Sequence, residues 1–168
     1  MSKVDDYGQR KRFNNTVKFI DETIEPVLCV CKEHPFDREL CEEFKIEYRH
    51  IKNDLDFNTN YHQETTLFCF DVIEFLMNPL NFLINHLGCE VIYISYQYNP
   101  FTFFWSPLHF VQYPKRSFEK LIEKAGYEIV KSKRIWFENF SLKGIRPILK
   151  ALTSSRYYYK LRVIRDEA

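Results

Sequence analysis

Hydrophobic positions follow helical and strand periods along most of the chain. The first pattern predicts an amphipathic helix over residues 10–24, with an apolar face made of Phe13, Val17, Ile20 and Ile24. Pro26 then ends this helix. The continuous apolar run VLCVC at 27–31 predicts a short strand that is covered on both faces of a sheet.

The middle of the chain repeats this succession. Apolar runs predict strands at 46–51, 66–73, 90–96 and 127–137, and helical periods predict helices at 36–44, 78–88 and 115–126. Asn78 and Pro79 have the chemistry of a helix start, and Gly88 and Gly126 that of a helix stop. Residues 97–114 are rich in proline and aromatic residues without a clear period, so we expect a long loop of the kind that is often functional.

The C-terminal part predicts a short helix at 145–152 and a last strand at 156–166. In that strand the apolar positions Tyr157, Tyr159, Leu161 and Val163 alternate with the cations Arg156, Lys160 and Arg162. This period of two predicts a half-buried strand whose cations face solvent. The order of elements predicts a three-layer α/β fold. We expect a mainly parallel sheet of about six strands, with 27–31 and 66–73 as central neighbours and the C-terminal strand antiparallel.

Length, composition and charge fit one globular domain. The 168 residues are 45% hydrophobic and 28% charged, so we expect a single folded domain over residues 1–168. The 24 basic and 23 acidic residues give a net charge of +1, and no nucleic-acid partner is expected from such a balance. We also expect no membrane span and a cytoplasmic location, because no long apolar run exists and the N-terminus is too polar for a signal peptide.

The cysteines favour core packing over metal or redox chemistry. There are five, an odd number in a chain without an export signal, which favours reduced thiols. Cys29 and Cys31 form a C-x-C pair that shares one face of a predicted strand, and no second pair stands at zinc spacing. We therefore predict that Cys29, Cys31 and Cys69 are buried, reduced and free of metal.

Two segments carry a resemblance to a known family. Residues 70–87, FDVIEFLMNPLNFLINHL, form a strand, a V-I-E turn, an N-P pair and a helix. Residues 105–130 form a histidine-bearing loop, a helix that ends in A-G-Y and a strand. In this order the segments resemble the class I S-adenosylmethionine-dependent methyltransferases of types 11 and 12. The resemblance implies a Rossmann-like methyltransferase fold and S-adenosylmethionine as cofactor.

The cofactor-binding part of that family is degenerate in this sequence. The family has an acidic residue and a glycine-rich turn after its first strand. In this sequence Cys29 stands at the place of the acid, and Cys31 and Glu33 stand near the places of the glycines. Asp54 stands roughly where a carboxylate could hold ribose hydroxyls, although an exposed acidic turn explains it equally well. These four positions and Asp71 are the cofactor-binding candidates that the resemblance implies.

Three side chains are catalytic candidates. Asp71 and Glu74 follow the strand at 66–73, where a carboxylate could act as a base or orient a substrate. The same pair could instead cap the turn and the start of the helix. His109 lies in the aromatic loop near the predicted cleft, and a loop histidine without a catalytic role is the open alternative.

Two classes of function follow. One is a small methyltransferase that acts on an unknown small-molecule or protein substrate, with residues 97–114 as a substrate lid. The other is a degenerate methyltransferase fold that serves as a binding or partner subunit through aromatic residues at 101–105. A homodimer is one form that such a subunit could take. Because the acid and the glycines are all replaced, we predict that the isolated chain does not bind S-adenosylmethionine or its demethylated product at physiological concentrations.

Overall fold

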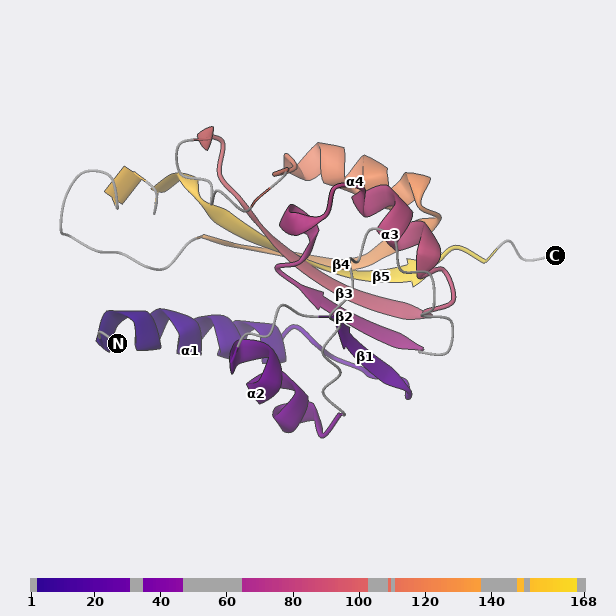
Figure 1. Ribbon diagram of the computed structural model, residues 1–168, viewed down its shortest axis with the longest axis horizontal. Coiled ribbons are helices and arrows are strands. Elements are labelled where there is room, and N and C mark those ends of the chain that lie inside the picture. Colours follow the sequence, from indigo (N-terminus) through magenta and orange to yellow (C-terminus); the bar gives the residue numbers. More distant parts are fainter. Residues whose placement is uncertain are drawn as a thin grey trace.

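The computed structural model of the chain describes residues 3–30, 35–46, 65–102, 109, 111–136, 148–149 and 152–165. Within these residues a five-stranded mixed sheet lies between two layers of helices (Figure 1). Helices α1 and α2 cover one face of the sheet, and helices α3 and α4 cover the other. The fold is therefore the three-layer α/β arrangement that the element order predicts.

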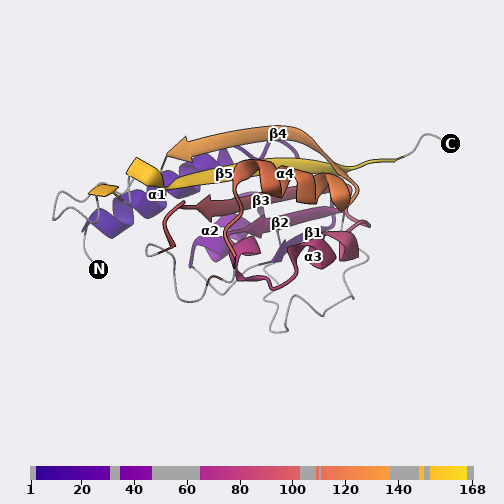
Figure 2. The same ribbon diagram turned by 90° about the horizontal axis from the view of Figure 1, so that it is seen from above.

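The strands are β1 (Val27–Val30), β2 (Thr66–Phe70), β3 (Val91–Tyr98), β4 (Tyr127–Trp136) and β5 (Ser155–Val163). Their order in the sheet is β1-β2-β3-β5-β4, which can be followed in Figure 2. Strands β1, β2 and β3 are parallel, and β5 is antiparallel to both β3 and β4. The predicted pairing of the first two strands and the antiparallel last strand are confirmed. However, β1 lies at the edge of the described sheet, and the strand predicted at 46–51 lies outside the described residues.

The helices are α1 (Lys3–Val17), α2 (Pro35–Phe44), the 3₁₀ turn η1 (Ile73–Phe75), α3 (Pro79–Asn85) and α4 (Lys115–Lys124). Asn78 caps α3 as predicted, because its side-chain oxygen accepts the backbone N–H of Asn81 at 3.1 Å. Gly126 follows α4 with φ of 86°, a conformation that favours glycine, so the predicted stop is confirmed. Helix α3 ends at Asn85, before Gly88. Residues 148–149 and 152–153 are helical, and the rest of the helix predicted at 145–152 lies outside the description.

The first helix is shorter at its C-terminal end than the apolar period predicts. It ends at Val17 and not at residue 24, and Ile24 is 38% exposed. The backbone N–H groups of Asp21 and Glu22 point to the Tyr93 hydroxyl on β3, at 3.4 and 3.2 Å. These contacts draw the chain onto the sheet, so tertiary hydrogen bonds replace the helical ones.

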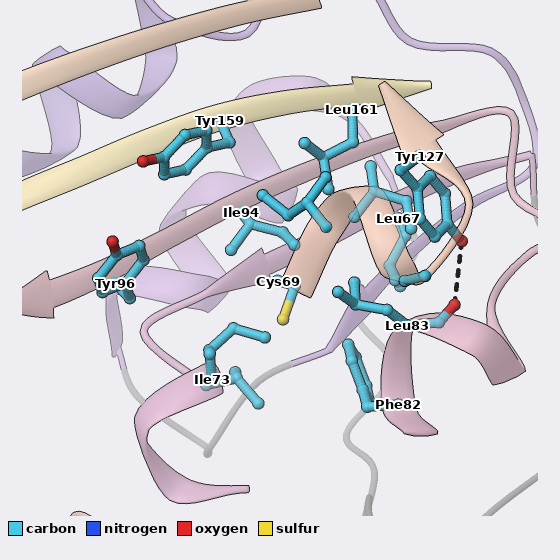
Figure 3. Packing of buried hydrophobic residues seen from close by; sticks show 14 of the residues in the cluster. Leu67, Cys69, Ile73, Phe82, Leu83, Ile94, Tyr96, Tyr127, Tyr159 and Leu161 are labelled. Atoms are coloured by element: carbon cyan, nitrogen blue, oxygen red, sulfur yellow. Dashed lines mark hydrogen bonds between the residues drawn. The ribbon is translucent and has the colours of Figure 1, made fainter. Parts of the chain in front are cut away.

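Each face of the sheet carries its own apolar core. Figure 3 shows part of the core under α3 and α4, to which all five described strands contribute side chains. In that core the Tyr127 hydroxyl donates to the Leu83 carbonyl oxygen at 3.1 Å, which ties β4 to α3. The opposite core includes Phe13, Phe36 and Phe68, and it holds α1 and α2 on the sheet. The alternation of side chains along each strand supplies both cores.

Strand β5 is buried on both faces, so the predicted solvated face is wrong for most of its length. Tyr159 and Leu161 belong to the core under α3 and α4, and Tyr158 belongs to the opposite core. Lys160 is only 5% exposed, since its ammonium lies 2.6 Å from an Asp21 carboxylate oxygen. The reason is that β5 lies between β3 and β4, where the chain after α1 covers its second face.

The predicted core cysteines lie where the apolar runs place them. Cys29 and Cys69 are buried in opposite cores, and Cys31 lies outside the described residues. Burial raises the pKa of the Cys69 thiol. Among the residues that the structure describes, no group of His, Cys, Asp and Glu is arranged to hold a metal ion, and none of the helices is long and apolar enough to cross a membrane.

Candidate functional site

A pocket of about 330 Å³ lies at the carboxyl ends of β2 and β3. Ligands of open α/β sheets bind at this end of the strands, and this volume is near the lower limit of typical ligand sites. The three predicted catalytic residues, Asp71, Glu74 and His109, all line it. The structure therefore brings together side chains that are up to 38 positions apart in the sequence.

Asp71 comes directly after β2 and lies at the centre of a charged triad. Its backbone has φ of 54°, and its N–H donates to the Ser95 carbonyl oxygen at 2.9 Å. One carboxylate oxygen accepts hydrogen bonds from the Ser95 hydroxyl and from Arg156, and the other lies 2.6 Å from an Arg12 nitrogen. Burial alone would raise the pKa of Asp71, but Arg12 and Arg156 lower it to about 2. The carboxylate is thus charged and occupied on both oxygens.

Arg12 reaches this triad from α1 and also covers the start of α2. Its guanidinium carbon lies 3.8 Å from the centre of the Phe36 ring, in a cation–π contact. Phe36 and the neighbouring Asp37 are both buried in the first turn of α2. Burial lowers the pKa of Arg12 and Asp71 opposes this effect. The first turn of α2 is therefore packed against a charged side chain of α1.

Glu74 is the most buried carboxyl group in the pocket, with 2% of its surface exposed. It lies on η1, and its Oε1 accepts the backbone N–H of Gln97 at 2.7 Å. Its Oε2 is buried without a hydrogen-bond partner in the described part of the chain. Burial, with the negative charge of Asp71, raises the pKa of Glu74 to about 8. Glu74 is therefore mostly protonated at neutral pH.

His109 is held by a chain of hydrogen bonds that begins next to β5. Asn99 donates from its side chain to the Ser154 hydroxyl at 2.6 Å, and its backbone N–H donates to Gln112 Oε1 at 2.7 Å. The amide nitrogen of Gln112 then lies 3.0 Å from His109 Nδ1. Because an amide nitrogen only donates, Nδ1 accepts and the ring proton lies on Nε2. The ring also meets Phe75 edge to face at 4.8 Å.

Of the predicted cofactor-binding residues that the structure describes, Asp71 lines this pocket and Cys29 does not. Cys29 is buried on β1 among apolar side chains of the core under α1 and α2. Cys31, Glu33 and Asp54 lie outside the described residues, so their predicted roles stay predictions.

The sequence analysis missed the two cations of this site, Arg12 and Arg156, among other lining residues. Arg156 opens the alternating strand β5, which the pattern assigned to a solvated face. Arg12 comes from a helix that has no local link to the strand ends. A buried carboxylate at the end of β2 requires a cation, and that requirement was the available signal.

The fold of this chain is that of the class I S-adenosylmethionine-dependent methyltransferases. Many solved structures of this class match it over most of its length, so the predicted resemblance is confirmed at the level of the fold. No protein-family model matches the sequence, and no curated protein matches it.

Three solved structures illustrate the likeness. The first is in the complex between the Haloferax volcanii Trm112 methyltransferase activator and a candidate methyltransferase. It matches with a TM-score of 0.67 and 8% sequence identity, and the match covers 98% of this chain and 95% of that one. The second is the magnesium protoporphyrin IX methyltransferase of Synechocystis with bound S-adenosylhomocysteine: TM-score 0.59, 11% identity, 96% and 88% coverage. The third is the [4+2]-cyclase SpnF: TM-score 0.62, 8% identity, 93% and 81% coverage. At these identities the likeness concerns the fold alone, which hosts more than one chemistry.

Proposed function

We propose that this chain is a degenerate methyltransferase fold that acts as a ligand-binding or partner subunit and does not use S-adenosylmethionine. The observation that carries this proposal is the triad of Arg12, Asp71 and Arg156 at the carboxyl end of β2. In the family that the sequence resembles, this end of the sheet is where the cofactor is expected. Here the carboxylate that could meet a ligand is already bound by two arginines.

The residues present do not fit S-adenosylmethionine. A ligand group that approaches Asp71 Oδ2 meets Arg12, which lies at 2.6 Å. The first turn of α2 follows the altered cofactor loop, and it is covered by the contact between Arg12 and Phe36. The sequence between β1 and α2 contains no glycine that would let the backbone approach a ligand closely.

The ion pairs of the triad would weaken the binding of any ligand that has to displace Arg12. Removing one partner from a buried ion pair costs about 3–5 kcal/mol, because the other charge is left without compensation. A ligand that must displace Arg12 would lose roughly two to three orders of magnitude in affinity. A micromolar cofactor site would then become a millimolar one.

Isothermal titration calorimetry with S-adenosylmethionine and with S-adenosylhomocysteine tests the proposal. We expect no measurable binding at ligand concentrations of about 100 μM, well below a millimolar dissociation constant. A dissociation constant of about 10 μM or tighter would contradict the proposal. The variants Asp71→Asn and Glu90→Gln would then show whether binding depends on the pocket, since Glu90 is exposed at the opposite ends of the strands.

A second candidate function is methyl transfer in the same pocket. It is favoured by one observation, the presence of Glu74 and His109 side by side with Asp71 in the pocket lining. A carboxyl group with a pKa of about 8 suits proton transfer near neutral pH. Tight binding in the titration above would support this candidate over the first.

A further inference from the structure

Among the described residues that line the pocket, carboxyl groups outnumber cations. Its lining contains the two cations Arg12 and Arg156 and the three carboxyl groups of Asp37, Asp71 and Glu74. Both arginines bind the Asp71 carboxylate. Their ion pairs with Asp71 leave the buried carboxyl group of Glu74 without an arginine partner.

The position of Glu74 leaves one oxygen for a donor from outside the protein. Its Oε1 is bound by the Gln97 N–H at 2.7 Å, and its buried Oε2 has no hydrogen-bond partner among the described residues. When Glu74 is ionised, this buried oxygen lacks a donor, which is unfavourable, so a ligand that supplies a donor gains this free energy on binding. Glu74 is 2% exposed and lines the pocket, so the pocket is the route by which such a donor reaches Oε2.

The rest of the lining suits a cation better than an anion. Phe70 and Phe75 line the pocket next to Glu74, and aromatic rings beside a carboxylate attract ammonium groups. An anion would meet Asp37 and Asp71, while the two arginines that could bind it already hold Asp71.

We infer that the pocket binds a small organic ammonium, whose N–H group donates a hydrogen bond to Oε2 of Glu74. This inference rests on the proposed function, because it takes the pocket as a ligand site without S-adenosylmethionine. The ligand class is an amine with a small apolar body, since the volume of about 330 Å³ and the two phenylalanine rings leave room for little else.

Binding is coupled to the proton of Glu74. Because burial and Asp71 raise the pKa of Glu74 to about 8, an ammonium must displace that proton at neutral pH. The charged and titratable groups that face Glu74 are Asp71 after β2, Arg156 on β5, Arg12 on α1, Asp37 on α2 and His109 after β3. Asp71 keeps its charge through neutral pH.

Nuclear magnetic resonance titration of the full chain with benzylamine tests this inference. This probe has about eight non-hydrogen atoms, so a dissociation constant of about 1 mM or tighter is expected. The backbone amide of Gln97 should shift, because it donates to Glu74. Affinity should rise about tenfold between pH 6 and pH 7, as the ionised fraction of Glu74 increases.

Two controls separate the Glu74 contact from weaker effects. Benzyl alcohol, which has the same shape without a charge, should bind at least about tenfold more weakly to the wild-type chain. The variant Glu74→Gln should lose benzylamine binding to the same extent, whereas Glu90→Gln, which neutralises an exposed carboxylate, should keep it. Absence of binding to the wild type, equal binding of the alcohol, or unchanged binding in Glu74→Gln would each overturn the inference.

The two proposals fail in distinguishable ways. Tight S-adenosylmethionine binding together with benzylamine binding would refute the proposed function alone. If neither ligand binds, the proposed function stands and the ammonium site is refuted.

Discussion

Replacing Glu74 by glutamine should remove a pH dependence of stability that this carboxyl group creates. The pKa of Glu74 is about 8 in the folded protein, against an ordinary value of 4.5 that we take for the unfolded chain. The folded state therefore binds more protons than the unfolded state between these two values. It follows that the free energy of unfolding falls as the pH rises through this window.

The size of the effect follows from the two pKa values. Ionising Glu74 in the buried pocket costs about 3 kcal/mol of stability between pH 5 and pH 8. The free energy of unfolding of a typical domain is 5–15 kcal/mol, so this loss is a large part of it. A change of about 3 kcal/mol alters the folding equilibrium constant by a factor of roughly 150. Glutamine keeps the oxygen that accepts the Gln97 N–H and cannot ionise, so Glu74→Gln should unfold at nearly the same urea concentration at both pH values.

Urea unfolding followed by circular dichroism at several pH values measures this difference. Glu90→Gln is the matched control, because it replaces a carboxyl group by the same amide at an exposed position. Its curve should follow the wild-type pH dependence. The reasoning is refuted if Glu74→Gln loses as much stability between these pH values as the wild type does.

Two further predictions concern the triad and the core. Arg156→Ala should lower the free energy of unfolding by about 3–5 kcal/mol, because Asp71 loses one of its two partly buried arginine partners. In Arg162→Ala, whose arginine is 46% exposed, the loss should be much smaller, and equal losses in urea unfolding would count against the triad. Cys69 should react slowly with a thiol reagent under native conditions, because burial raises its pKa, and labelling as fast as in urea would contradict this.

Local patterns predicted the elements whose residues determine their own conformation. The cap and proline at Asn78 and Pro79 predicted the start of α3, and Gly126 marked the end of α4. The apolar runs predicted β1 and β2 as neighbouring strands. These features depend on backbone conformation and on side chains within a few positions, so the sequence contains them directly.

The site was predicted in part for the same reason. Asp71 and Glu74 were singled out because they follow a strand end, and the structure places both in the pocket together with His109. Local sequence patterns could not predict that the pKa of Asp71 is lowered and that of Glu74 is raised. Glu74 is buried and Asp71 is partly buried. The two arginines bind Asp71 and neither forms an ion pair with Glu74, and this difference arises from α1 and β5 packing at one strand end.

The sequence by itself determined the periods of the helices and strands, their caps and stops, and the apolar runs that form the two cores. Tertiary structure decided where α1 ends, because the Tyr93 hydroxyl binds the backbone of Asp21 and Glu22 and holds that segment on the sheet. It also decided that Arg156 is partly buried, because β5 lies between two strands and its N-terminal end reaches the pocket. A period along the chain shows which side chains share a face. The charges that compensate a buried group come from distant segments, and only the packed fold brings them within reach.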